Sequence, residues 1–312
     1  MAKIRIRFCY SSGQKVEIQG NRAVRVLTIL ARFGTATYSG AEEQINEIFR
    51  RQMPTIERSV VVVDNALPRE FTEPGERRVV IGGDNTSREF SAFDRALDYV
   101  RAEISQYDLV HFATSAFNQL YTDYLARFDT ALLSAIATRP ACVGHIDCYN
   151  EPVEILGFQS QHWIRTCFFF LPPTEVRLLG TLTTVRKPEV FFSATPGAPF
   201  RPDAPLSEKY REYITSWLSG RDIGQGVAWH SSFALSEETR LSFEGKAVAI
   251  MNEQLLGVRL RAMGCQLIDV TWLSTMLGRG PGSSLQWRTA WQEQLANRDR
   301  DALKMTAAAV VN

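Results

Sequence analysis

The hydrophobic pattern in the first half of the chain consists of short apolar runs, and the last three of them end in polar residues. Four such runs lie at residues 25–30, 59–65, 78–85 and 107–115. Their apolar residues are mostly consecutive instead of alternating, which is typical of strands buried on both faces of a parallel sheet. We therefore predict an α/β fold with a mostly parallel sheet flanked by helices, in which right-handed crossovers join the four strands.

Segments with other periods complete the predicted first half. Residues 41–51 and 87–100 carry apolar side chains at helical spacing, and residues 120–138 are predicted as a further helix. Residues 141–147 form another short apolar run and are predicted as a strand. Near the N-terminus, residues 3–18 alternate between apolar and polar positions around a Ser-Ser-Gly turn, which predicts an antiparallel hairpin.

The pattern changes in the second half. The strongly apolar segment 164–171 predicts a strand, and the prolines after it open a predicted helix at 172–185. Five of the 13 prolines fall within 188–205, which predicts a long loop. Such a loop inside a compact domain is more often a lid or binding segment than an idle one. We predict an α/β region at 1–205 and a helical C-terminal region at 206–312, packed on the same domain.

Composition places the chain among ordinary globular proteins. Apolar residues make up 45% and charged residues 22% of the 312 positions. The formal net charge of +1 gives no electrostatic reason to expect nucleic acid as a partner. Five widely spaced cysteines lack the paired spacing of a zinc site, so we expect reduced thiols. Because no apolar run has the length of a membrane span or signal peptide, we expect a cytoplasmic protein, with the inner face of the membrane as one place of action.

Polar residues follow the predicted strands at the points where they end. Asp64 lies near the end of the run at 59–65, Asp84 near the end of the next run, and Ser115 ends the run at 107–115. The carboxyl ends of parallel strands face one side of an open α/β sheet, where such folds bind ligands in a crevice. We therefore expect the functional site at this side of the sheet.

The order of these elements resembles that of GT-A glycosyltransferases, which transfer sugars from nucleotide donors. In that family the second strand ends in an aspartate that contacts the nucleotide base, as Asp64 would. Segment 84–97 is similar to the family segment that follows the third strand, with Asp94 where asparagine is common. The resemblance covers roughly the first two-thirds of the chain on short motifs. It implies a GT-A-like, Rossmann-like fold and a nucleotide-sugar substrate.

The chain departs from this family at the position of its metal motif. GT-A enzymes usually carry Asp-x-Asp after the fourth strand, where this chain has Thr114-Ser115-Ala116. A hard divalent cation prefers carboxylate oxygens to hydroxyls, so we expect transfer without a divalent metal. The donor diphosphate then needs cationic side chains, and Arg88 is the first candidate because a guanidinium can bind phosphate bidentately. The alternative is that Arg88 is a surface arginine at the start of a helix.

A second similarity lies in the C-terminal region. Residues 206–220 resemble the family's Glu-Asp helix, with Glu208 in place and Lys209 where the aspartate stands. His230 resembles a histidine that contacts metal or diphosphate. An inverting transfer needs a carboxylate to take the acceptor proton, so we predict Glu208 as the catalytic base and Asp147 as the second choice. The plainer alternatives are a capping carboxylate for Glu208 and a hydrogen-bonded core histidine for His230.

The segment around Arg165 bears on the donor and the acceptor. We expect Trp163 and Arg165 to face the acceptor sugar, although Trp163 is also explained as a core residue. Residues 165–171 resemble bacterial rhamnan and O-antigen assembly proteins. This implies a deoxysugar donor such as dTDP-rhamnose, a glycan or lipid-linked glycan acceptor, and other domains of a larger polysaccharide-assembly enzyme as partners. The residues expected to contact the donor are Arg32, Asp64, Asp84, Arg88, Ser115, Arg165 and His230.

Two other functional classes fit parts of the sequence. A glycosyltransferase-like domain that serves as a non-catalytic scaffold would explain the missing metal motif. A Rossmann dinucleotide enzyme fits less well, because no Gly-x-Gly-x-x-Gly follows any predicted strand. We expect an inverting, metal-independent glycosyltransferase, and binding of dTDP or UDP would separate it from the scaffold.

Overall fold

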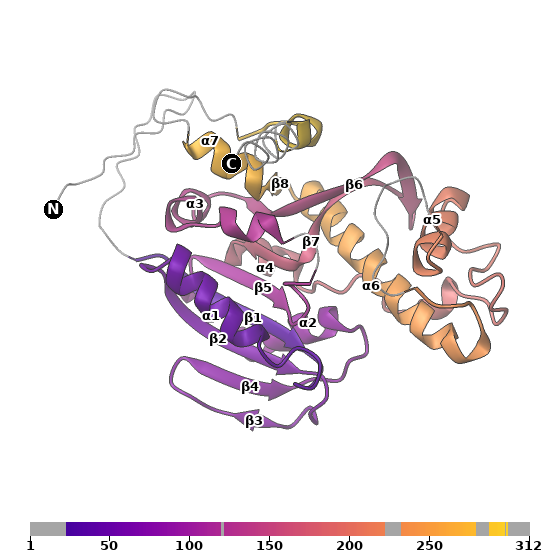
Figure 1. Cartoon of the computed structure of the whole chain (residues 1–312), viewed down its shortest axis with the longest axis horizontal. Coiled ribbons are helices and arrows are strands. Elements are labelled where there is room, and N and C mark those ends of the chain that lie inside the picture. The colour runs from indigo at the N-terminus through magenta and orange to yellow at the C-terminus, as the bar shows by residue number, and fades with distance from the viewer. Residues whose placement is uncertain (1–22, 120–121, 222–231, 279–286, 297, 299–312) are drawn as a thin grey trace, which may run out of the picture.

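The centre of the molecule, seen here in a computed structural model, is a mixed β-sheet. The structure describes residues 23–119, 122–221, 232–278, 287–296 and 298, and within them the sheet has eight strands. They are β1 (Arg25–Arg32), β2 (Glu57–Asp64), β3 (Thr72–Glu73), β4 (Arg78–Gly82), β5 (Leu109–Thr114), β6 (Ala141–Ile155), β7 (Phe158–Leu171) and β8 (Gln266–Asp269). Their spatial order is β3-β4-β2-β1-β5-β7-β6-β8 (Figure 1).

Helices cover both faces of this sheet. The α-helices are α1 (Ala41–Gln52), α2 (Glu89–Tyr99), α3 (Thr130–Ile136), α4 (Pro173–Leu179), α5 (Glu208–Leu218), α6 (Glu237–Ala262) and α7 (Val270–Gly278). Three 3₁₀ turns are described: η1 (Ile104–Gln106), η2 (Asp123–Arg127) and η3 (Pro188–Val190). Helices α1, α3 and α7 pack on one face of the sheet and form an apolar core with it. Helices α2, α4 and α6 form a second apolar core with the opposite face. No described helix has the length and apolarity of a membrane span.

Four strands form the parallel half of the sheet. Strand β1 pairs in parallel with β2 and with β5, and β2 pairs in parallel with β4. Their central residues are buried in the cores above and below the sheet, which explains why apolar residues are consecutive in these runs. The prediction that the four apolar runs lie parallel in one sheet is confirmed.

The hairpin of β6 and β7 is longer than predicted. The sequence indicated strands at 141–147 and 164–171, but each strand extends toward a tight turn at Leu156 and Gly157. Both turn residues have positive φ, 54° and 77°, as the type I′ turns of two-residue hairpins require. Leucine is a rare residue for such a turn, so the local sequence hides it. Strand β7 pairs antiparallel with both β5 and β6, which makes the sheet mixed.

Two predicted helices are less continuous than their apolar spacing indicated: one is divided and the other ends early. The helix predicted at 120–138 is divided into η2 and α3 because Asp129 adopts an extended conformation and its carboxylate accepts a hydrogen bond from the backbone N–H of Leu132. The helix predicted at 172–185 stops at Leu179, since Gly180 has a φ of 71°. The N-terminal hairpin predicted at 3–18 lies outside the described residues.

Strand β8 departs from the prediction of a helical C-terminal region. Its four residues pair in parallel with β6, from Ala141 opposite Gln266 to Gly144 opposite Asp269. The buried Asp269 carboxylate accepts the backbone N–H of Ile146, which ties the two strands together. The sheet is therefore built from both of the predicted regions.

A third core lies beyond the sheet, at the far end of the hairpin. It joins the outer halves of β6 and β7 to α5, to the first half of α6 and to the proline-rich segment 188–205 (Figure 1). Phe192 and Phe200 from that segment stack on each other and pack against Phe243 of α6. Apart from η3 and isolated bridges the segment has no regular structure, as predicted, but its aromatic side chains anchor it in the core.

A histidine is buried within the parallel half of the sheet. His111 on β5 is fully buried, and its Nδ1 lies 3.2 Å from the Thr28 hydroxyl on β1. Its ring packs against Phe168 and Phe170, with centroids 4.2 and 4.5 Å away. Burial, together with the positive charge of Arg58, holds the pKa of His111 well below its ordinary value. The imidazole is therefore neutral in the folded protein.

This neutral histidine predicts a loss of stability in mild acid. Below pH ~6.5 the unfolded chain takes up a proton at His111 that the folded chain does not, so stability falls as the pH falls through this range. We expect a contribution of about 1 kcal/mol between pH 7.5 and pH 5.5, measured by urea unfolding. A His111→Phe variant should lose that part of the pH dependence. An unchanged pH dependence in the variant would assign it to other groups, such as His162.

Candidate functional site

Four of the predicted residues lie where the parallel strands end. Arg32 is the last residue of β1, Asp64 is the last of β2, Asp84 follows β4 by two positions and Ser115 follows β5 directly. We call this side of the sheet the carboxyl edge. The strand order reverses here, because β2 and β4 lie on one side of β1 and β5 lies on the other. Open α/β sheets bind ligands outside such a reversal point.

Asp64 organises the carboxyl edge from within. It is 3% exposed, and its carboxylate accepts hydrogen bonds from Arg32 Nε at 2.8 Å, Gly34 N at 2.8 Å and Ala66 N at 3.0 Å. Burial alone would raise the pKa of Asp64, but the two backbone N–H groups and the guanidinium outweigh it and lower the pKa. The ionised carboxylate therefore fixes Arg32 and the loops after β1 and β2.

The antiparallel hairpin brings two more predicted residues to this edge. Strand β7 pairs with β5 up to Phe168, which lies opposite Ala113, so the residues that precede Phe168 continue past the end of β5. Arg165 is among them, and its Nε lies 3.2 Å from the Asp147 carboxylate on β6. His145 Nε2 lies 3.4 Å from the other carboxylate oxygen. The structure thus places Asp147 and Arg165 together, next to the reversal point.

The charges around Asp147 keep its carboxylate ionised. Burial would raise the pKa of Asp147, but the hydrogen bond from His145 and the positive charges of Arg165 and Arg298 lower it below its ordinary value. Both carboxylate oxygens face a basic group. Asp147 is therefore a weak proton acceptor at neutral pH and a strong partner for the Arg165 guanidinium.

Helix α6 adds a carboxylate that the sequence did not single out. The Oε2 atom of Glu253 accepts hydrogen bonds from Thr166 N at 2.7 Å and Thr166 Oγ1 at 2.6 Å, and its Oε1 accepts one from Trp163 Nε1 at 2.9 Å. Burial raises the pKa of Glu253 to about 7 against the lowering effect of the Thr166 donors. Gly257, one turn later, packs closely on Trp163, and a Cβ there would lie 3.4 Å from the Trp163 Cα, at the near limit of ordinary contact.

Trp163 and the polar triplet 252–254 correct the prediction for this segment. Trp163 is 2% exposed and packs against Tyr149, so it is a core residue and does not face an acceptor sugar. Asn252 and Gln254 are fully buried; Asn252 accepts hydrogen bonds from two backbone N–H groups, and Gln254 donates one to the Tyr149 hydroxyl. A polar triplet inside the otherwise apolar stretch 247–257 of α6 is the sequence signal that could have identified Glu253.

A groove of about 640 Å³ lies beside the carboxyl edge, between the β4–α2 connection and α6. Asp84, Arg88 and Arg95 line one wall, and Arg186 and Glu244 line the other. On α2, the Asp94 carboxylate accepts hydrogen bonds from Leu182 N and Thr183 N, which holds the segment of the far wall in place. The groove therefore contains several arginines within a rigid frame.

The turn that carries Arg88 is conformationally strained. Asn85 and Arg88 have φ values of 54° and 52°, which are rare for residues other than glycine. Asn65 holds the turn by donating to Asn85 Oδ1 at 3.2 Å and to the Arg88 carbonyl at 3.0 Å. Among the described residues, neither Asn65 Oδ1 nor Arg88 Nε has a hydrogen-bond partner, and both atoms are buried. Such strain persists where the surrounding structure enforces it, and it is concentrated at binding sites.

Asp84 lies at the mouth of the groove. Its carboxylate accepts hydrogen bonds from Arg69 Nη1 at 2.8 Å and from the backbone N–H and hydroxyl of Thr86 at 3.0 and 2.8 Å. Burial alone would raise the pKa of Asp84, but the Thr86 donors and the charge of Arg69 lower it. The carboxylate is half-buried and keeps Arg69 beside the groove.

Glu208 lies apart from the other predicted residues. It is the exposed first residue of α5, and the neighbouring Ser207 N donates to the Glu154 carbonyl near the hairpin turn. Glu154 and Asp147 are both on β6, and the strand between them spans roughly 20 Å at its usual rise per residue. Glu208 and Asp147 are therefore not brought to one site. His230 lies outside the described residues.

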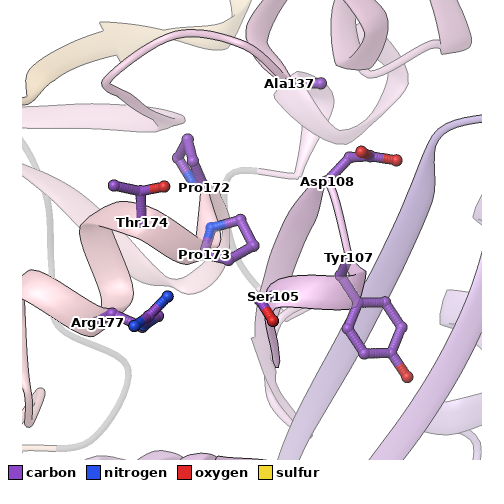
Figure 2. A pocket seen from close by; sticks show the side chains of 8 residues that line it. All are labelled: Ser105, Tyr107, Asp108, Ala137, Pro172, Pro173, Thr174 and Arg177. Carbon is purple, nitrogen blue, oxygen red and sulfur yellow. The ribbon is translucent and has the colours of Figure 1, made fainter. Parts of the chain in front are cut away.

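A smaller pocket lies at the opposite edge, where β5 begins (Figure 2). Pro173 and Arg177 line one side, and Tyr107 and Asp108 line the other. Its volume is about 180 Å³, which is below the usual range of small-molecule sites. The Asp108 carboxylate accepts the backbone N–H of Arg25 at 2.8 Å, so it contributes to the start of β1.

The structure describes the segment that aligns with the metal motif of GT-A enzymes. Where GT-A enzymes carry their metal motif, Thr114 and Ser115 present hydroxyl groups. Within the described ranges, no group of three or more His, Cys, Asp or Glu side chains is arranged to hold a metal ion. The four cysteines in these ranges are free thiols.

Comparison with known proteins adds no family to this geometry. The chain matches no family model, and no curated protein matches it. A function is therefore inferred from the chemistry of the carboxyl edge and the groove.

Proposed function

We propose that the protein is a glycosyltransferase that moves a sugar from a nucleoside-diphosphate donor to a glycan acceptor. The observation that carries this proposal is that the Arg165–Asp147 pair lies on the same side of the sheet as Arg32 and Ser115, where the strand order reverses. Cationic groups next to carboxylates fit a reaction in which a diphosphate leaves while a hydroxyl loses a proton. The resemblance to GT-A enzymes agrees with this chemistry.

The donor would lie along the carboxyl edge. In this proposal the nucleoside occupies the arginine-lined groove near Arg88, and the diphosphate lies toward Arg32 and Ser115. The sugar then lies on the side of Asp147, and Arg165 lies between Asp147 and the diphosphate. The arginines take the role that a metal ion has in many GT-A enzymes, because a guanidinium can bind two phosphate oxygens at once. The resemblance to rhamnan and O-antigen proteins favours dTDP-rhamnose as donor and a lipid-linked glycan as acceptor.

Inversion at the sugar follows from the geometry of a direct displacement. The acceptor oxygen forms a bond to the anomeric carbon while the bond to the diphosphate breaks, and the diphosphate leaves with the electron pair. A carboxylate on the acceptor side takes the hydroxyl proton. Of the two predicted carboxylates, Asp147 lies at the carboxyl edge and Glu208 lies near the hairpin turn.

A non-catalytic binding module is the second candidate. The hydroxyls of Thr114 and Ser115 in place of a carboxylate pair favour it. Such a module would bind the nucleotide at the same groove without turnover. It would therefore share the affinity of the proposed enzyme for dTDP or UDP and lack its reaction.

The test combines binding and turnover. Thermal unfolding is measured with dTDP, UDP and GDP, and transfer is measured with dTDP-rhamnose and octyl rhamnoside as a model acceptor. We expect a rise of the midpoint with a pyrimidine nucleotide, and product formation that persists after EDTA treatment. Nucleotide binding without transfer of rhamnose from dTDP-rhamnose, either to octyl rhamnoside or to water, would favour the binding module. The absence of any nucleotide binding would contradict both candidates.

Replacement of Arg88 tests the groove. Arg88→Ala should weaken nucleotide binding about tenfold or more, because a charge-assisted hydrogen bond to a phosphate contributes roughly 1.5–3 kcal/mol. Isothermal calorimetry gives the dissociation constant. Arg51→Ala is the matched control, since Arg51 is exposed and pairs with Glu47 on the surface of α1, away from the groove. Equal affinities of the two variants would return Arg88 to a surface role.

A further inference from the structure

The carboxylate of Glu253 is fixed by hydrogen bonds and still has a free lone pair on one of its oxygens. Three hydrogen bonds fix it: two from Thr166 to Oε2 and one from Trp163 to Oε1. A carboxylate oxygen has two lone pairs, so Oε1 keeps one for a further partner. Glu253 as a whole is half-buried, whereas the residues on both sides of it in α6 are fully buried. Glu253 is therefore held in one orientation and still has an accepting position.

The position of Glu253 follows from the pairing of β7 with β5. Thr166 precedes Phe168, which lies opposite Ala113 near the end of β5. The Thr166 backbone N–H and hydroxyl therefore hold the carboxylate of Glu253 just past the end of that strand. This is the side of the sheet where the donor sugar is placed in the proposed function.

Asp147 and Glu208 are less suited to accept a proton at this place. Both oxygens of Asp147 face basic groups, Arg165 and His145, and these charges lower its pKa. Glu208 lies on the exposed start of α5, near the hairpin turn. A proton acceptor works best when its pKa lies near the working pH. Neither carboxylate combines that property with a position at the carboxyl edge.

Burial supplies this property at Glu253. Burial is the largest influence and raises the pKa of Glu253 to about 7. The Thr166 donors and the Arg165 charge lower this pKa, and the Asp147 charge raises it. The titratable and charged groups that face Glu253 from the elements packed around it are Asp147 and Tyr149 on β6, Arg165 and Cys167 on β7 and Tyr210 on α5. Arg165 is the only cation in this set, and its Nε is already paired with Asp147.

We propose that Glu253 is the catalytic residue that accepts the proton of the acceptor hydroxyl, and that Asp147 instead holds Arg165 against the donor diphosphate. This role rests on the proposed sugar transfer. The hydroxyl proton moves to Oε1 of Glu253 as the acceptor oxygen forms its bond to the anomeric carbon. The diphosphate leaves with the electron pair of the broken bond. The proton on Glu253 then passes to solvent.

The first experiment compares Glu253→Gln with Asp147→Asn. Turnover of dTDP-rhamnose with octyl rhamnoside should fall about 100-fold or more in Glu253→Gln, with the dTDP dissociation constant unchanged. The acidic limb of the pH profile, set near pH 7 in the wild type, should disappear from the residual activity. Asp147→Asn should weaken dTDP binding and retain the acidic limb, which moves to lower pH because the Asp147 charge raises the pKa of Glu253. Near-wild-type turnover and an intact limb in Glu253→Gln would overturn the role of Glu253.

A second variant keeps the proposal testable if Glu253→Gln does not fold. Thr166→Val removes the hydroxyl that donates to the ionised carboxylate, so the acidic limb should move to higher pH. A purely structural role of Glu253 would leave the limb in place, and that result would overturn the proposal. Absence of transfer by the wild type would contradict the proposed function as a whole. Transfer with an unchanged limb in Thr166→Val would contradict the role of Glu253 alone.

Discussion

Replacing Asp64 with alanine is expected to destabilise the fold by about 3–5 kcal/mol. The variant leaves the Arg32 guanidinium, which is 17% exposed, without its carboxylate partner, and it removes the acceptor of two backbone N–H groups. Removing one member of a buried ion pair costs more than the pair contributes, because the remaining charge stays desolvated. The free energy of unfolding in urea measures the effect.

Asp84→Ala is the matched control for this variant. The Asp84 side chain is 32% exposed and pairs with Arg69, which is 59% exposed, so its loss should cost about 0–1 kcal/mol. Asp64→Asn adds a test of charge. The folded pKa of Asp64 is lowered, so its contribution is present above the unfolded pKa of ~3.9 and is lost as the pH falls through the folded value. Asp64→Asn should remove that dependence, and equal costs for the two alanine variants would contradict the buried role.

Gly82→Ala is expected to destabilise the parallel half of the sheet strongly. A Cβ at Gly82 would lie 1.6 Å from the Pro68 carbonyl oxygen and 2.5 Å from its carbon. Both are backbone atoms, so no side-chain rotation relieves the overlap, and β4 must separate from the turn after β2. We expect a cost above the usual ~1–3 kcal/mol of an overpacked site, seen as a lower midpoint of thermal unfolding.

Gly40→Ala serves as the control for the effect of the methyl group itself. Gly40 precedes α1 with a φ of −86°, and the nearest atom to its Cβ would be 3.8 Å away. The substitution should change stability by less than about 1 kcal/mol. If Gly82→Ala unfolds at the same temperature as Gly40→Ala, then the contact between β4 and Pro68 is looser than the structure indicates.

The parallel half of the fold could be predicted because its signal is local. A strand buried on both faces needs consecutive apolar residues, and the runs that became β1, β2, β4 and β5 satisfy this requirement within a few residues each. Strand β8 has four residues between two helices, too short for any period to emerge. The turn at Leu156 and Gly157 was hidden because leucine carries no turn signal.

The residues of the candidate site likewise fall into those that the local sequence identifies and those that depend on distant contacts. Asp64 and Ser115 could be identified from the ends of the predicted strands, because parallel strands place their carboxyl ends on one side of the sheet independently of side-chain packing. Glu253 could not be placed from sequence, because its position depends on the contact of α6 with Thr166, which is distant along the chain. Glu208 was chosen from motif spacing, and spacing carries no information on how far the hairpin extends.

The pairing of β8 with β6 has a consequence for synthesis on the ribosome. Strand β6 leaves the exit tunnel with one edge unpaired, and its partner at residues 266–269 follows only after most of the second half has been translated. At typical elongation rates this interval is on the order of ten seconds. During it the open backbone edge of β6 can pair with the same strand of a neighbouring nascent chain. A chaperone that covers extended segments would act in this interval, and slow codons after β7 would lengthen the exposure.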